Sequence, residues 1–268
     1  MGQFVGFGNG QDGDLIVSTD QSLDTANLIS SCSGTAGTRT LTVAAGLSFA
    51  SGQIVLIHQS RGDLGDTGKW ELAQIDSYAA TTLTLKSNLE NTYTDSGASQ
   101  AQVMALKQYR NVTIDATKKL SCDTWNGDIY GILSFMVSGV LTINGKLNAK
   151  GLGFRGASSE RRQGEGTNNG NFNVITSANG NGGGGAADVS DASGAGGGNG
   201  AVGSNGNTSS GGNTSGIADL TNMTFGGGGG SGNDDGTGRG NNIYQGNDGG
   251  GIILIFAKDV ICNGVAGS

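Results

Sequence analysis

The feature that most constrains this chain is a long glycine-rich stretch flanked on both sides by strand-like sequence. Residues 151–251 hold 34 of the 53 glycines of the chain, which contains no proline. Apolar residues are scarce in this stretch, so burial of apolar surface cannot offset the conformational entropy that its ordering would cost. Flexible linkers usually contain proline, and its absence argues mildly against a disordered tether.

Glycine-rich chains have one other route to an ordered structure, which is to pack as polyproline-II helices. These helices have three residues per turn, and glycine lets their backbones approach closely enough for N–H···O and Cα–H···O contacts. Blocks that suit this packing are "GGGG" (182–185), "GAGGGNG" (194–200) and "FGGGGGSG" (225–232). We therefore expect residues 151–250 to form a polyproline-II-like region, with a free tether as the alternative.

The sequence before the glycine-rich region has a pattern of short strand-like runs that is typical of an all-β domain. Between residues 38 and 110, short aliphatic and β-branched runs such as "GQIVLIHQS" (52–60) and "TTLTLKSNL" (81–89) alternate with clusters of Gly, Asn, Asp and Ser. Their spacing of about 10–15 residues is typical of a small antiparallel barrel or sandwich. We predict an N-terminal small β domain over residues 1–110.

Short strands with close turns flank the glycine-rich region at 111–150 and 251–268. The segment "GILSFMVSGVLTINGK" (131–146) resembles the segment "GIILIFAKDVICNGVA" (251–266). The alignment matches Gly131 with Gly251, Ile132 with Ile252, Phe135 with Ile255 and Val140 with Val260, and it is one residue out of step by the Asn-Gly turn. Short strands that must stack to bury a face are typical of β-solenoid rungs. The predicted fold class is all-β: a small barrel or sandwich, then β-solenoid rungs that enclose the polyproline-II-like region (151–250).

The charge pattern narrows the classes of partner. The net charge is −7 and charged residues make up 14% of the chain, so no basic patch is visible that could bind nucleic acid or an anionic membrane. No apolar run reaches 18 residues, so we expect no membrane span. The start of the chain, "MGQFVGFGNG", has no basic segment followed by an apolar one, so it does not read as a signal peptide.

Cysteines and acidic turns give little support for a cofactor or a metal. Cys32, Cys122 and Cys262 are far apart and form no CxxC pair, so they are either core residues or one disulfide and a free thiol. The acidic segments at 12–15 and 233–238 only partly resemble calcium loops, because neither repeats in register or has a glutamate at the twelfth loop position. We expect no cofactor and assign no metal ligand.

Catalytic chemistry is poorly supported by the residue types present. The only histidine, His58, lies inside a strand-like run, where a structural role is far more common than a catalytic one. A cluster of carboxylates could support glycoside hydrolysis but is expected to lie in a solvated loop and strand. Its members are Asp63, Asp66, Glu71 and Asp76. We assign no catalytic residue and predict that the chain is not an enzyme.

Four aromatic residues are the candidates for ligand binding. They lie in the glycine-rich region, where turns are expected, and exposed aromatic rings beside Asn and Asp can stack on sugars. These residues are Phe154, Phe172, Phe225 and Tyr244. The alternative is that each ring fills a gap in a poor core.

The chain resembles a family through its overall pattern. A "SGQIVLIHQSRG" segment (51–62) is followed by "GKWELAQIDSY" (68–78), by strand-like runs, and by a corner "GLGFRG" (151–156) before the glycine tract. This order is similar to that of the glycine-rich modules of bacterial surface proteins and of phage tail-tip and fibre adhesins. The resemblance implies an extracellular, cell-surface or virion location, and some tail-tip adhesins fold comparable glycine tracts into polyproline-II bundles.

These observations lead to one expected function and two alternatives. We expect a non-enzymatic extracellular structural or adhesive surface protein that self-associates, with copies of itself or a cell-surface glycan or protein receptor as partners. The first alternative is a phage tail-tip or fibre protein that recognises a host surface. The second is a polysaccharide-degrading β-solenoid enzyme.

Overall fold

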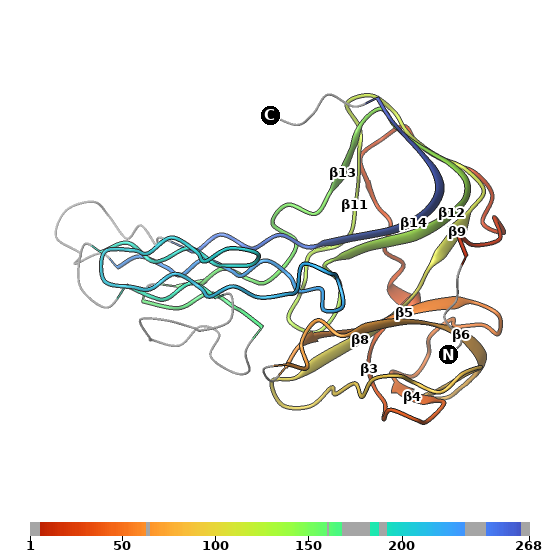
Figure 1. Cartoon of the computed structure of the whole chain (residues 1–268), viewed down its shortest axis with the longest axis horizontal. Helices are drawn as coiled ribbons and strands as arrows, with labels where there is room; N and C mark the ends of the chain where they lie inside the picture. Colours follow the sequence, from red (N-terminus) through yellow and green to blue (C-terminus); the bar gives the residue numbers. More distant parts are fainter. Residues whose placement is uncertain are drawn as a thin grey trace.

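The structure is a computed structural model that describes residues 6–62, 65–159, 161–167, 183–187, 192–233 and 245–263. The described part is all-β apart from one 3₁₀ turn, Ala26–Leu28. It consists of a closed barrel, two parallel sheets beside the barrel, and a bundle of extended glycine-rich segments that projects from the junction between them (Figure 1). Among the described residues there is no helix with the length and apolar character needed to cross a membrane.

Six antiparallel strands close the barrel. In barrel order they are β3 (Ile29–Ser33), β4 (Thr40–Val43), β7 (Thr82–Leu85), β6 (Trp70–Ala79), β5 (Ile54–Arg61) and β8 (Gln100–Ala105). Strands β4 and β7 alternate between exposed or half-buried threonines and buried aliphatic residues, so one face of each strand fills the barrel and the other faces outward. The barrel that the sequence predicted as one of two possibilities is thus confirmed.

Strand β5 is buried on both faces, which explains its continuous apolar run. Val55 and Ile57 point into the barrel core, whereas Leu56 packs in a second core outside the barrel. That second core receives side chains from the parallel sheets and from the glycine-rich region. Strand β5 therefore lies at the centre of the molecule and joins its three parts.

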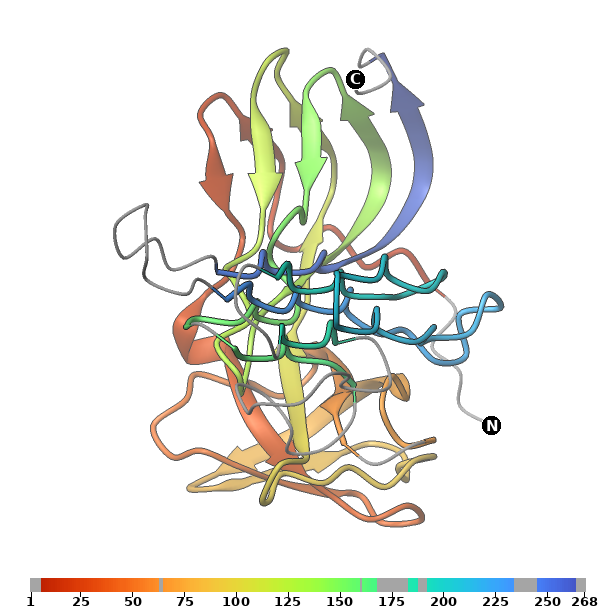
Figure 2. The ribbon, with the colours of Figure 1, turned by 90° about the vertical axis from the view of Figure 1, so that its left-hand side faces the viewer.

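The two parallel sheets share a core. The strand order of the first sheet is β1 (Leu15–Val17), β10 (Val112–Ile114), β12 (Ile132–Ile143) and β14 (Ile252–Cys262), and β9 (Lys107–Tyr109) also pairs with β12. The strand order of the second sheet is β13 (Lys146–Asn148), β11 (Lys119–Ser121) and β2 (Gln21–Ser22). Every pairing in them is parallel, and Figure 2 shows the strands side by side. Buried aliphatic and aromatic residues such as Val17, Val112 and Phe135 form the core shared by these strands.

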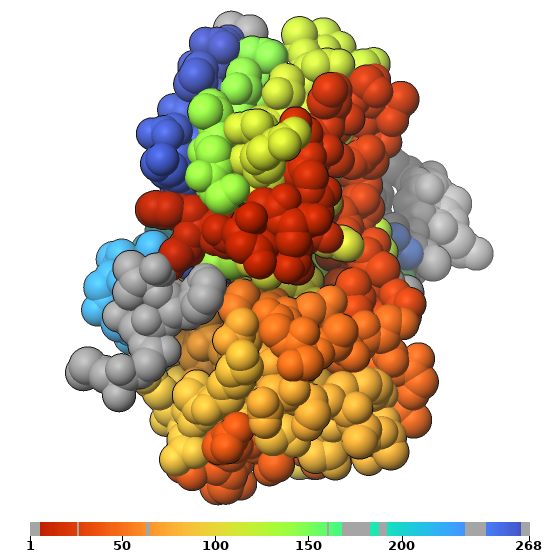
Figure 3. Space-filling model, turned by 90° about the vertical axis from the view of Figure 1, so that its right-hand side faces the viewer, coloured from red at the N-terminus to blue at the C-terminus, as the bar shows by residue number. Residues whose placement is uncertain are grey.

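The first strands of the chain belong to these sheets and not to the barrel. β1 pairs with β10 and β2 pairs with β11, so the 1–110 boundary predicted from sequence does not follow the strand pairing. Figure 3 shows the start of the described chain, in red, lying across the face where barrel and sheets meet. There the Asp12 amide donates to the carbonyl oxygen of Gln108 at 3.0 Å.

The long pairing of β12 with β14 closes the glycine-rich excursion. The predicted matches of Ile132 with Ile252 and of Phe135 with Ile255 are confirmed as paired positions. A register shift after Val137 places Val140 beside Asp259, one residue earlier than the predicted partner Val260. The chain therefore leaves the sheet after β13 and returns as the neighbour of β12.

Backbone hydrogen bonds connect the glycine-rich segments. The Gly164 amide donates to the Gly184 carbonyl, the Gly184 amide to the Gly228 carbonyl, and the Gly228 amide to the Glu165 carbonyl, each at 2.9 Å. A Cβ atom added to Gly164 would lie 2.0 Å from the carbonyl oxygen of Gly228, and one added to Gly246 would lie 1.8 Å from that of Gly229. Only glycine permits this approach, so the described segments form an interlocked bundle and not a free tether.

Candidate functional site

The three parts of the molecule meet at a cluster of aromatic rings. Trp125, from the loop between β11 and β12, lies 6.3 Å from Phe154 and 5.2 Å from Phe225, measured between ring centroids. Phe154 lies near the start of the glycine-rich region and Phe225 lies 71 residues later in it, and their rings are 5.2 Å apart. All three side chains are almost completely buried.

This burial corrects the expectation that Phe154 and Phe225 are exposed and able to stack on a ligand. Both residues have no exposed surface, and both pack with Met223 and Leu56 in the core outside the barrel. They fill the core, as the alternative reading held, because the close glycine backbones leave large side chains no other apolar surface to cover. The other two candidates, Phe172 and Tyr244, lie outside the described residues.

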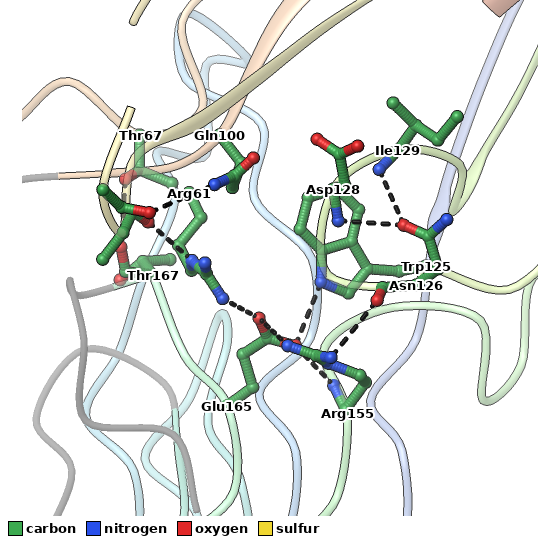
Figure 4. Close-up of polar contacts among 12 residues, drawn as sticks. Arg61, Thr67, Gln100, Trp125, Asn126, Asp128, Ile129, Arg155, Glu165 and Thr167 are labelled. Atoms are coloured by element: carbon green, nitrogen blue, oxygen red, sulfur yellow. Dashed lines mark hydrogen bonds and ion pairs between the residues drawn. The ribbon is translucent and has the colours of Figure 1, made fainter. Parts of the chain in front are cut away.

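A buried carboxylate, that of Glu165, lies at the same junction (Figure 4). Trp125 Nε1–H donates to Oε2 at 3.0 Å, and Arg155 donates to the carboxylate from its backbone N, Nε and Nη2 at 3.1, 2.9 and 3.1 Å. Arg61 Nη1 forms a further ion pair with Oε1. The Glu165 side chain is only 1% exposed, so these donors replace its hydration.

Each partner of Glu165 belongs to a different part of the fold. Arg61 ends strand β5 of the barrel, and its Nε donates to the carbonyl oxygen of Ala98 at 2.7 Å. Trp125 belongs to the loop that precedes β12, and Arg155 belongs to the start of the glycine-rich region. Arg155 Nη1 also donates to the carbonyl oxygen of Asn126 in that loop, at 3.2 Å. Removing Glu165 would therefore remove contacts to all three parts at once.

The chemistry available at this junction is structural. Both oxygens of Glu165 accept hydrogen bonds from protein donors, and the neighbouring charges are two guanidinium groups. A general acid or base must reach the reacting atom of a substrate, whereas this carboxylate is enclosed by its partners. We assign the junction the task of fixing the glycine bundle to the barrel.

His58 forms a second connection close by. Its Nε2 lies 2.8 Å from the carbonyl oxygen of Met223, and its Nδ1 lies 2.9 Å from Ser60 Oγ. Because a carbonyl oxygen can only accept, Nε2 carries the proton and Nδ1 accepts from Ser60. Complete burial lowers the pKa of His58 to about 4. No carboxylate contacts the ring among the described residues, so the arrangement is not a catalytic triad.

The predicted carboxylate cluster does not form a common site in the described structure. Asp63 lies outside the described residues, and the other members have separate partners: Asp66 pairs with Lys69 at 2.6 Å, Asp76 pairs with Arg39 at 3.3 Å, and Glu71 accepts from the backbone amides of Glu90 and Asn91 at 3.0 Å. Nowhere in the described ranges do three His, Cys, Asp or Glu side chains converge as metal ligands.

The three cysteines are free thiols. Cys32 is buried in the barrel core and Cys122 in the core of the parallel sheets, whereas Cys262 is exposed at the end of β14. Two of them are therefore core residues, as one of the predicted alternatives held, and the described structure contains no pairing among the three.

Sequence reasoning missed the residues that hold the junction together. Its one usable signal was the mixed charge cluster from Arg155 to Glu165, which also contains Glu160, Arg161 and Arg162. Acidic residues among arginines are compatible with a compensated buried charge as well as with a solvated surface, so the sequence does not single out Glu165.

Comparison with known proteins does not assign the chain to a family. No protein-family model matches the chain, and no curated protein matches it.

Proposed function

We propose that the chain is a non-enzymatic structural and adhesive module that acts on a cell surface or a virion. Its partners would be copies of itself, a cell-surface glycan or a protein receptor. The proposal rests on the resemblance to surface and tail-tip modules together with the projecting glycine bundle.

The observation that carries the proposal is the close packing of the glycine-rich segments. Their hydrogen-bonded backbones leave no room for side chains at positions such as Gly164, Gly228 and Gly246. We propose that these segments are polyproline-II helices, the conformation expected when glycine backbones approach this closely. Such a bundle has little apolar interior in which to enclose a substrate, and it offers a neighbour a surface of backbone and short polar side chains.

The parallel sheets would supply the base for this bundle. The chain places one strand in each sheet in turn, as β1 and β2, then β10 and β11, then β12 and β13. We propose that these turns are β-solenoid rungs, since stacked rungs bury a continuous core and hold a rigid direction. The Glu165 junction and the His58 contact would keep the bundle at a fixed angle to the barrel beside these sheets.

A phage tail-tip or fibre protein is the second candidate. The bundle projects away from the barrel in Figure 1, which suits a module that presents its far end to a host surface. In self-assembly the far end of the bundle would contact another copy of the chain, whereas in host recognition it would contact a receptor on the host surface.

One set of measurements tests the proposal with the full-length protein. A fluorescent conjugate is added to a panel of intact bacterial cells, and the unlabelled protein is examined by electron microscopy and light scattering. We expect saturable binding to at least one cell type, or assemblies that form without added ligand. Reducing-end release from bacterial polysaccharides, with neither binding nor assembly, would overturn the proposal in favour of an enzyme.

A matched pair of variants connects the result to the bundle. Glu165→Gln removes the charge that holds the bundle, and Asp76→Asn removes an exposed pair on the barrel wall. We expect the first variant to weaken binding or assembly and the second to leave both unchanged.

A further inference from the structure

The barrel carries an open groove with a volume of about 440 Å³, and none of the residues that hold Glu165 lines it. Its lining comes from two stretches of chain, 33–42 and 92–96. This volume lies within the range of roughly 300–1,000 Å³ that small-ligand sites occupy. The groove belongs to none of the sites described above.

Nearly every side chain in the groove ends in a hydroxyl group. The first stretch contributes the threonines at 35, 38, 40 and 42 together with Ser33, and the second contributes Thr92, Thr94 and Ser96. Of these eight hydroxyls, the described structure engages only two with protein partners: Thr38 Oγ1 donates to the Thr35 carbonyl at 2.7 Å, and Thr92 Oγ1 accepts from the Ala36 amide at 3.1 Å. The remaining six are available to donate and accept.

One carboxylate accompanies these hydroxyls. Asp95 is half-buried, lines the groove, and makes no side-chain hydrogen bond with any residue that the structure describes. No lysine or arginine lines the groove, and its one aromatic residue, Tyr93, has a ring that is 2% exposed and packs in the barrel core. The lining therefore offers hydrogen bonds to a ligand but neither a cationic charge nor an apolar face.

The frame of the groove is held rigidly. Gly34 and Tyr93 exchange two backbone hydrogen bonds, at 3.0 and 2.8 Å, which join the two stretches. Gln59 is buried and holds Thr94 from both sides: its Oε1 accepts from the Thr94 amide at 2.8 Å, and its Nε2 donates to the Thr94 carbonyl at 2.9 Å. A rigid frame lowers the conformational entropy that ligand binding would cost.

We propose that this groove binds a neutral saccharide. A chain of sugar units offers rows of hydroxyls that both donate and accept, as do the threonines, and a carboxylate such as Asp95 can accept from two adjacent sugar hydroxyls. Because no exposed ring is available for stacking, affinity at one groove should be in the millimolar range and adhesion would require several copies. The inference adds a ligand class to the proposed adhesive role without depending on it.

Nuclear magnetic resonance titration of the ¹⁵N-labelled full chain tests the proposal. The probes are maltohexaose, cellopentaose, mannohexaose and chitohexaose, each up to about 20 mM, a range suited to millimolar dissociation constants. At least one probe should produce saturable amide shifts confined to 33–42 and 92–96. The absence of such shifts with all four probes, or shifts concentrated elsewhere, would overturn the proposal.

Matched variants then test the hydroxyl groups themselves. The double substitution Thr40→Val and Thr42→Val removes two groove hydroxyls, whereas Thr82→Val and Thr84→Val alter their direct strand neighbours, which lie outside the lining. We expect the first double variant to raise the dissociation constant about fivefold or more and the control to change it less than twofold. Asp95→Asn should weaken binding as well. Equal losses in the groove and control variants would contradict the assignment, and the spectra report whether each variant is folded.

These outcomes are independent of the cell-binding assay. A chain that binds cells but no oligosaccharide loses the groove proposal alone, whereas a chain that binds an oligosaccharide but neither cells nor its own copies loses the adhesive proposal alone.

Discussion

His58 on barrel strand β5 donates its Nε2–H to the carbonyl oxygen of Met223, 165 residues further along the chain. The ring is fully buried, and it also lies 5.9 Å from that of Phe225. Ser60 Oγ, which hydrogen-bonds Nδ1, accepts in turn from Gln102 Nε2 at 2.8 Å. The neutral imidazole is thus held at both nitrogens, and a proton added at Nδ1 would end the hydrogen bond that this nitrogen accepts from Ser60 and would place a charge on a fully buried ring.

Acid should therefore weaken the folded state through His58. The pKa of His58 is lowered from 6.5 to about 4, so between these values the unfolded chain binds more protons than the folded one. The corresponding stability is fully present above pH 6.5 and is lost as pH falls toward 4, by at most about 3 kcal/mol. Urea unfolding at pH 7 and pH 4.5 measures it. Since His58 is the only histidine, His58→Gln should abolish this part of the pH dependence; an unchanged slope would contradict the assignment.

Asp24 should have the opposite effect on the pH dependence of stability, because its ionisation destabilises the folded state as pH rises. Burial raises the pKa of this carboxyl from 3.8 to about 6, although its Oδ2 accepts from the Asp123 amide at 2.6 Å. Its contribution is fully present below pH 3.8 and is lost as pH rises through 6, so Asp24→Asn should stabilise the protein at pH 7.5 by about 1–2 kcal/mol. The matched control is Asp20→Asn, because the more exposed Asp20 accepts from the Lys119 amide in the same way. A stabilisation of similar size in the control would show that burial is not the cause.

Replacing Glu165 should loosen the whole junction. Glu165→Gln leaves two guanidinium groups without their shared carboxylate, and breaking a buried ion pair in this way costs about 3–5 kcal/mol. Asp76→Asn, in an exposed pair, should cost less than about 1 kcal/mol. Urea unfolding measures both variants, and limited trypsin digestion should cut the Glu165 variant fastest at Arg155, Arg161 and Arg162. Equal protection of those bonds in both variants would mean that the bundle does not need the junction.

Glycine substitutions should separate packed positions from open ones. A Cβ atom at Gly228 would lie 2.0 Å from the carbonyl oxygen of Arg155, whereas one at Gly200 would meet nothing within 4 Å. Gly228→Ala should therefore destabilise the chain by about 3 kcal/mol or more, and Gly200→Ala by less than about 0.5 kcal/mol. Thermal unfolding compares them directly. Two variants of equal stability would indicate that the segments are not packed as described.

The parts that could be predicted from sequence are those set by local pattern. The spacing of short strand-like runs is enough to indicate a small barrel or sandwich, and the likeness of 131–136 to 251–256 places β14 beside β12. The one-residue step between the two segments is visible in the sequence at their Asn-Gly turns, but its position directly after Val137 was not predicted, because the place of an extra residue in a paired strand leaves no compositional mark.

The errors concern contacts between distant segments. Phe154 and Phe225 resemble exposed loop residues because their sequence neighbours are glycines, while their burial comes from rings and backbones many residues away. The pairing of β1 with β10 likewise depends on the way the chain returns after the barrel closes. No short-range pattern specifies which segments meet.

Because β14 is synthesised after every other described strand, β12 remains without its main partner strand until β14 emerges from the ribosome. The barrel needs only residues up to 105, so it can close early in synthesis, whereas Ser134 waits for Leu254, 120 residues later, to supply the carbonyl to which its hydroxyl donates. During that interval the apolar edge of β12 and the outer face of β5 lack their final cover. The glycine-rich excursion, having little apolar surface of its own, offers that edge few wrong partners while the last strand is still being made.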